Sequence, residues 1–133
     1  MEQANINRDI AASLLTAMGN RDIAAILSFF GENTDWYIPG DEANVPWLGK
    51  RQYKSEIADF YKLLWENTVP IDASIAGIFT NGNQVVISGE FTTLMTKKKE
   101  TVQSMFFIHM IIENGLITRY RLLEDSFAVS AAM

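Results

Sequence analysis

The side chains that could do chemistry in this sequence are few, and the best of them gather near its end. Glu124 and Asp125 close the segment RYRLLED, and Tyr120 precedes them on the same stretch. A carboxyl group in apolar surroundings has a raised pKa, so it can exchange protons with a substrate near neutral pH. Glu124 and Asp125 are therefore candidate general acids or bases, and Tyr120 could polarise a substrate oxygen. The alternatives are an ordinary rim acid for Glu124 and a turn cap for Asp125.

Other catalytic chemistries are restricted by what the sequence lacks. It has no cysteine, which excludes disulfides, thiolate metal sites and cysteine nucleophiles. His109 is the only histidine, which excludes a multi-histidine metal centre and leaves one imidazole for any serine triad. The sequence contains no P-loop, glycine-rich dinucleotide motif or metal-ligand spacing. We therefore expect neither a metal nor a cofactor.

Length and charge narrow the class of protein. The chain has 133 residues, 48% of them hydrophobic, with eleven basic and sixteen acidic side chains. We expect a single domain over residues 1–133, with its core at about 6–128. The acidic balance argues against nucleic acid and against anionic membranes as partners. The charged first segment is not typical of a signal peptide, and the longest nearly apolar run is too short to span a bilayer, so we expect a cytoplasmic protein.

The hydrophobic pattern predicts a helical first half followed by strands, which is the order of an α+β domain. We expect helices over about 6–18, from a cap at Asn20 to Gly31, and over about 51–67. An extended piece over 34–38 follows the second helix. Strands are expected over about 72–79, 84–95, 101–112 and 116–125, joined by the turns TNGN, KKKE and ENG. A long antiparallel sheet curls, so we expect the three helices to cover its concave face.

Four stretches of the chain resemble a known fold family. They are GNRDIAAILSFFGENTDWYIPG, PWLGKRQYKSEIADFY, NGNQVVISGEF and ENGLITRYRLLED. They resemble the nuclear-transport-factor-2-like fold, a cone formed by a curved sheet. Within that fold the chain is similar to SnoaL-like polyketide cyclases, limonene epoxide hydrolase and ketosteroid isomerase, over roughly residues 6–128. The resemblance implies a pocket for a small apolar molecule and, in many members, a homodimer formed through the convex face of the sheet.

The sequence departs from these relatives at the catalytic positions. The cyclases and the epoxide hydrolase carry an Asp seven residues after the hairpin glycine, and counting from Gly115 gives Leu122. The strand that matches the arginine-bearing strand of the epoxide hydrolase, QVVISGEFTTLM, has no Arg. We therefore do not transfer that mechanism, and Glu124 is the best remaining acid.

The ENG turn decides which side chains face the expected pocket. A three-residue loop closed by Gly115 pairs Ile108 with Tyr120 and Ser104 with Glu124. A two-residue Asn-Gly turn would instead place His109 across from Tyr120, because one residue of slip changes every neighbour. The first register puts Ser104, Phe106, Ile108, Met110, Tyr120, Leu122 and Glu124 on one face. The resemblance places that face toward the pocket.

The two faces give two candidate surfaces. We expect a ligand pocket lined by Trp36, Tyr37, Trp47, Tyr53, Phe60, Phe106, Ile108 and Leu122. The alternative is that these side chains simply fill the interior. In the third helix, Tyr61 and Trp65 widen the apolar stripe beyond what one buried face needs. On the opposite face of the sheet we expect a homodimer interface that contains Met105, Phe107, His109, Ile111, Arg119 and Arg121, because a strand that is apolar on both faces is normally covered on both.

Three functions fit these observations. The first is a cofactor-independent isomerase, cyclase or hydratase/hydrolase that acts on a small apolar substrate. The second is a module that binds such a molecule without chemistry. The third is a dimeric interaction domain whose interior is filled by its own side chains. The sequence names no substrate.

Overall fold

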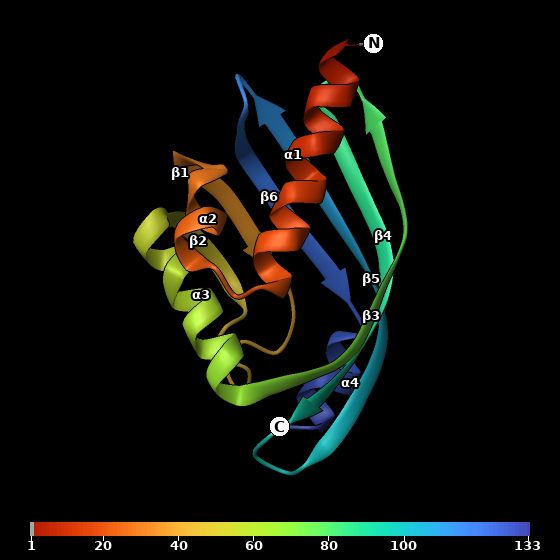
Figure 1. The fold of residues 1–133 in the computed structure, drawn as a ribbon. Helices are drawn as coiled ribbons and strands as arrows, with labels where there is room; N and C mark the ends of the chain where they lie inside the picture. Colours follow the sequence, from red (N-terminus) through yellow and green to blue (C-terminus); the bar gives the residue numbers. More distant parts are fainter. Residues whose placement is uncertain (1) are drawn as a thin grey trace.

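The computed structural model describes residues 2–133, which form four helices and one six-stranded sheet (Figure 1). In chain order the elements are α1 (Glu2–Gly19), α2 (Ile23–Ser28), β1 (Phe30–Ile38), β2 (Gly49–Tyr53), α3 (Lys54–Asn67), β3 (Thr68–Asn81), β4 (Gln84–Met95), β5 (Glu100–Glu113), β6 (Leu116–Glu124) and α4 (Ser126–Ala131). The expected α+β class is confirmed. The chain has one helix, α4, and one strand, β2, that the pattern did not indicate, and the extended piece expected over 34–38 is part of β1.

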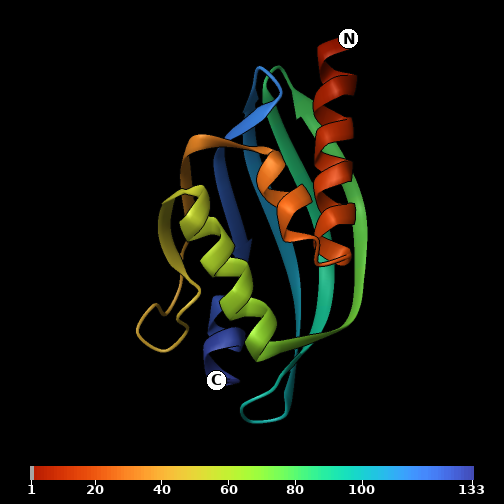
Figure 2. The ribbon, with the colours of Figure 1, turned by 60° about the vertical axis from the view of Figure 1, so that its left-hand side comes forward.

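The sheet has the strand order β2-β1-β6-β5-β4-β3, and only β1 and β6 run parallel. The strands β3 to β6 form a meander of long neighbours joined by short turns, as the alternating pattern predicted. The sheet is long and curved, and α1, α2 and α3 lie on one side of it (Figures 1 and 2). Because β2 and β3 remain as edge strands, the pairing closes no complete cone.

Local capping explains where the helices differ from expectation. The second helix is shorter than predicted and begins after Asp22, whose side chain accepts a hydrogen bond from the Ala25 N–H at 3.1 Å. Asn20 is therefore not the cap. The third helix begins at Lys54, because the Glu56 carboxylate accepts the N–H groups of Gln52 and Tyr53 and fixes the start. After Asp125 the chain forms a further short helix, α4, that the pattern did not indicate.

The β5–β6 hairpin differs from the predicted pairing in a way that leaves the faces unchanged. Asn114 and Gly115 both have positive φ, 52° and 78°, which makes a two-residue turn and pairs Glu113 with Leu116. The predicted three-residue loop is therefore wrong. A bulge at Thr118 then adds one residue to β6, so Met110 pairs with Tyr120. The partners lie two positions from those predicted, and an even shift keeps every side chain on its predicted face.

The core lies between the helices and the concave face of the sheet. Its centre is an aromatic cluster in which the rings of Trp36 and Tyr120 stack at 4.2 Å between centroids. Phe60 of α3 meets Trp36 edge-on at 5.0 Å, and Tyr61 lies against both. All four side chains are 3% exposed or less. The side chains of the cluster themselves fill the space that the sequence suggested for a ligand.

Candidate functional site

Glu124 is the last residue of β6 and faces the same side of the sheet as the core. It pairs with Phe106 of β5, a buried residue whose ring lies over Gly89 of β4. A Cβ at Gly89 would come within 2.7 Å of that ring, so the glycine makes room for it. The Glu124 carboxyl therefore lies beside an aromatic ring. A carboxyl at the end of a strand more usually has polar side chains and water around it.

Burial changes the acidity of Glu124. Removal of water, and after it the neighbouring negative charge of Asp125, together raise the pKa of its carboxyl from 4.5 to about 7. A carboxyl with a pKa near 7 populates both the protonated and the ionised form at neutral pH. It can therefore take up and release a proton during a reaction.

Asp125 has a structural role in this arrangement. Its side chain accepts a hydrogen bond from the Ala128 N–H at 3.0 Å and caps α4. Its backbone N–H donates to the hydroxyl of Ser104 at 2.9 Å. These two bonds set the direction in which the chain leaves β6. Asp125 therefore acts as a cap, which is the alternative role that the sequence suggested for it.

A pocket of about 510 Å³ opens around the end of β6. Glu124, Asp125 and Ser104 line one part of it, and Met105, Phe107 and Leu123 of the convex face line the other. Its remaining lining residues are Glu90 and Gln103. The pocket joins Glu124 to the convex face because β6 stops there while β5 continues to Glu100.

Tyr120 lies deeper than Glu124, in the aromatic cluster. Burial raises the pKa of its phenol, and the charge of Glu124 raises it further, while the nearby Tyr61 hydroxyl acts in the opposite direction. The pKa of Tyr61 is also raised well above its usual value, first by burial and then by Tyr120. Both phenols therefore stay protonated and can act as hydrogen-bond donors.

Three polar atoms in this cluster have no hydrogen-bond partner among the residues that the structure describes. They are the hydroxyls of Tyr61 and Tyr120 and the indole Nε1 of Trp36. The two hydroxyls are close enough to affect each other's pKa, but they do not meet the geometry of a hydrogen bond. Buried polar groups are normally paired, so three unpaired ones in one cluster are unusual. Sequence analysis did not identify Tyr61 as a site residue; its only signal was the widened stripe of the third helix.

The other residues expected around a pocket divide between the interior and the surface. Trp47, Phe60, Phe106 and Ile108 are buried, and Leu122 packs against the core. Tyr37 lies instead on the convex face, with the Arg121 guanidinium 5.9 Å from its ring. Tyr53 is 52% exposed at the start of α3.

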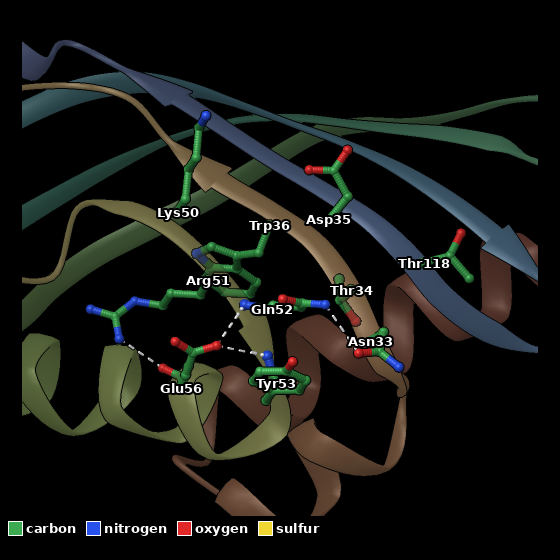
Figure 3. A pocket seen from close by; sticks show the side chains of 10 residues that line it. All are labelled: Asn33, Thr34, Asp35, Trp36, Lys50, Arg51, Gln52, Tyr53, Glu56 and Thr118. Carbon is green, nitrogen blue, oxygen red and sulfur yellow. Dashed lines mark hydrogen bonds between the residues drawn. The ribbon is translucent and has the colours of Figure 1, made fainter.

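A second pocket, of about 620 Å³, lies between β1, β2 and the start of α3 (Figure 3). Trp36, Asp35 and Glu56 are among the residues that line it. Figure 3 shows that Glu56 points back to the chain at Gln52 and Tyr53, and Gln52 donates to Asn33. The polar groups that line this second pocket thus hold the local backbone in place. We therefore regard the Glu124 pocket as the better candidate site.

The residues expected at an interface lie on the convex face. Met105 and Phe107 are 64% and 45% exposed, and Ile111 and Arg119 are half-buried beside them. His109 hydrogen-bonds through Nε2 to the Gln84 side chain at 2.9 Å, and Arg121 forms an ion pair with Asp35 at 2.9 Å. The homodimer itself stays a prediction.

Two further observations concern metals and membranes. Across residues 2–133, no three His, Cys, Asp or Glu side chains come together as metal ligands would. Over the same range, every helix is too short or too polar to cross a membrane.

The raised pKa of Glu124 predicts how stability depends on pH. The folded protein holds a proton that the unfolded chain releases between pH 4.5 and about 7. The free energy of unfolding should therefore fall as the pH rises through this window, by about 3 kcal/mol from this group. Chemical denaturation at a series of pH values should show this loss in the native protein and not in Glu124→Gln. The control is Glu66→Gln, an exposed site on α3, which should follow the native curve. Parallel curves for the native protein and Glu124→Gln would contradict the assignment.

The unpaired hydroxyl of Tyr61 gives a second prediction. A buried hydroxyl without a partner destabilises the folded state, so Tyr61→Phe should raise the free energy of unfolding by about 1 kcal/mol. Tyr37→Phe, on the convex face, should change it by less than about 0.5 kcal/mol. If Tyr61→Phe instead lowers stability in urea denaturation, its hydroxyl is bonded in solution.

Comparisons with known proteins show which fold and which sequence family this chain shares. No curated protein matches the chain. Among solved structures, an NTF2-like protein from Burkholderia pseudomallei K96243 aligns with a TM-score of 0.88 at 14% identity, over 96% of each chain. TerC, crystallised with polyporic acid, aligns with a TM-score of 0.82 at 18% identity, over 96% of this chain and 97% of that one.

An LEH-like epoxide hydrolase from M. tuberculosis aligns with a TM-score of 0.75 at 14% identity, over 98% of this chain and 90% of that one. At these identities the likeness establishes the fold alone. The sequence family described as the SnoaL-like domain matches residues 11–120. Because that match spans most of the sequence, this chain belongs to the SnoaL-like domain family.

Proposed function

We propose that the protein is a cofactor-independent acid–base enzyme that moves a proton on a small, uncharged, largely apolar substrate. Glu124 is the group that takes and returns the proton. The single observation that supports this most is that a carboxyl with a pKa of about 7 lines a pocket with one apolar wall, formed by Met105, Phe107 and Leu123. Perturbed acids in clefts are frequent at catalytic sites.

The lining of the pocket indicates the class of substrate. Its charged residues, Glu90, Glu124 and Asp125, are all acidic, so an anionic substrate would be repelled. Met105, Phe107 and Leu123 offer apolar contact on the other side. A neutral molecule with a carbonyl group and an apolar body fits both features.

The reaction follows from one group that both accepts and donates a proton. The ionised Glu124 carboxylate removes a proton from a carbon next to the substrate carbonyl, and the electron pair moves onto the carbonyl oxygen as an enolate. The protonated carboxyl then returns the proton to another carbon of the enolate, and the carbonyl is restored. Nothing is oxidised or reduced, so the step is an isomerisation. An aldol-type cyclisation would begin with the same proton removal.

The resemblance noted in the sequence implies that Leu122 stands where the related cyclases carry an aspartate. Glu124 lies two residues later on the same face. That displacement moves the acid from the filled interior to the pocket at the end of β6. Other proteins of this fold support small-molecule chemistry in general: TerC was crystallised with polyporic acid, and another neighbour is described as an epoxide hydrolase.

A second candidate is a module that binds a small ligand without chemistry. The three unpaired polar atoms of Trp36, Tyr61 and Tyr120 favour it, because a ligand oxygen could satisfy them. Trp36, Tyr61 and Tyr120 are all 1% exposed or less, so such a ligand would have to displace part of the aromatic cluster. Tyr120 would then polarise the ligand oxygen, as the sequence suggested.

Proton exchange at carbon separates these two functions. We expect the protein to accelerate the exchange of the protons beside the carbonyl of small cyclohexenones in D2O, followed by ¹H NMR. Glu124→Gln should lower the rate by about 100-fold or more, since an essential general base contributes that much. Glu66→Gln, distant from the pocket, should retain the native rate. Equal rates for the native protein and Glu124→Gln would exclude the enzyme, whereas ketone binding without exchange would favour the binding module.

A further inference from the structure

The Glu124 pocket contains a buried hydroxyl that the proton transfer itself does not use. Ser104 of β5 lines this pocket and is only 6% exposed. Its side chain lies on the same face of the sheet as Glu124, because it is two residues from Phe106, the residue that pairs with Glu124. Phe106 and Glu124 form the last pair between β5 and β6, so Ser104 lies just beyond the end of β6. The hydroxyl and the carboxyl therefore face the same space.

The separation of these two groups suits a carbonyl compound. Diagonal neighbours on one face of an antiparallel pair lie about 7–8 Å apart. The long side chain of Glu124 shortens this gap between its carboxyl and the Ser104 hydroxyl. In an enone, the carbonyl oxygen and the carbon that loses a proton are a few bonds apart. One such molecule can therefore present its C–H to Glu124 and its oxygen to Ser104.

Hydrogen bonds fix the Ser104 oxygen and leave its proton able to turn. The oxygen accepts the Asp125 backbone N–H at 2.9 Å, at the start of α4, which lies beside β5 (Figure 1). The hydroxyl donates to the carbonyl of its neighbour Met105 at 2.6 Å. A hydroxyl proton can rotate to another acceptor, and a bond accepted from an N–H polarises the hydroxyl and makes it a stronger donor. Ser104 can therefore donate to a substrate oxygen and keep the bond from Asp125.

The charges of the pocket create a need for such a donor. Enolate formation places negative charge on the carbonyl oxygen, and the acids Glu90 and Asp125 line the same pocket and oppose that charge. Two lining residues, Gln103 and Ser104, carry a side-chain amide or hydroxyl that can donate to an oxyanion. Gln103 is exposed on the opposite face of β5, whereas Ser104 is buried on the face of the carboxyl. A fixed donor shielded from water stabilises an oxyanion more strongly than one in water, which favours Ser104.

We propose that the Ser104 hydroxyl donates a hydrogen bond to the carbonyl oxygen of the substrate and stabilises the enolate that Glu124 generates. The proposal rests on the proposed function of Glu124, because it assigns the second group that the same reaction needs. The C–H proton moves to the Glu124 carboxylate, and the electron pair of that bond moves onto the carbonyl oxygen. Ser104 keeps its own proton throughout, and its hydrogen bond strengthens as the oxygen becomes negative. Return of the proton from Glu124 to carbon restores the carbonyl.

The rate of proton exchange tests this role. Ser104→Ala should lower kcat for the exchange of cyclohexenone protons in D2O by about 100-fold and change KM little, because the hydrogen bond is strongest in the transition state. Ser104→Thr keeps a hydroxyl on the same carbon and should recover most of the lost rate. Ser55→Ala makes the same substitution at an exposed site on α3, outside the pocket, and should keep the native kcat and KM.

The carbonyl stretch of a bound ketone gives a second measurement that needs no turnover. A hydrogen bond to a carbonyl oxygen weakens the C=O bond and lowers its stretching frequency. Difference infrared spectra of cyclohexenone labelled with ¹³C at the carbonyl should show a lower frequency on the native protein than on Ser104→Ala. Ser104→Thr should return the frequency toward the native value, and Ser55→Ala should not change it.

Two results would overturn the proposal while Glu124 remains the base: an exchange rate in Ser104→Ala equal to that of the native protein, or a carbonyl frequency that rises in Gln103→Ala and not in Ser104→Ala. Failure of the proposed function looks different, because exchange would then be equal in the native protein and Glu124→Gln. The role of Ser104 in enolate formation would fall with it, and a carbonyl frequency that still depends on Ser104 would then describe only the binding of a ketone.

Discussion

The pairing of β5 with β6 determines which side chains lie under the helices and which lie outside. Strand side chains alternate between faces, so a shift of one residue would move Tyr120 and Glu124 to the convex face. The two-residue turn at Asn114 and Gly115 alone would produce that shift. The bulge at Thr118 reverses it. The stacking of Trp36 on Tyr120, the packing of α3 on that pair and the burial of Glu124 all depend on this extra residue.

The buried side of the sheet then contains two features that work against stability. The carboxyl of Glu124 has lost much of its water, and its nearest charged neighbour on the chain, Asp125, is also an acid. Behind it, the hydroxyls of Tyr61 and Tyr120 have no hydrogen-bond partner within residues 2–133. A domain that only needed a filled interior could place apolar side chains at these positions with less penalty. Unfavourable polar groups of this kind are frequently retained at sites where they act on a ligand.

The sequence predicted the large features of this structure and missed those set by single residues. The class, the long strands and the division of β5 and β6 into faces follow from hydrophobic periodicity, which many residues specify together. The start of α2 depends on one side chain, Asp22, which competes with Asn20 for the cap. Similarly, β2 is a short strand where the sequence predicted the end of a loop and the start of the third helix, and only its pairing with β1 gives it order.

The sequence predicted some residues of the candidate site and missed others. Glu124 was singled out because it lies two residues beyond the position where the resemblance implies an aspartate, on the same face of the strand. Tyr37 was placed in the pocket by its aromatic type, but the alternation along β1 turns it outward next to Trp36. Tyr61 was missed because the sequence cannot show that its hydroxyl has no partner. The surroundings of that hydroxyl depend on how α3 packs against β1, where Tyr61 meets Trp36.

The most direct test of these conclusions is the titration of Glu124 itself. The ¹³C resonance of its side-chain carboxyl, assigned by comparison with Glu124→Gln, reports its ionisation in the native protein. A half-buried acid at the end of β6, shielded from water as the structure shows it, should titrate at a pKa of about 7. Titration near the ordinary value of about 4.3 would show that water reaches the carboxyl freely, and Glu124 would then be a rim acid with no part in proton transfer.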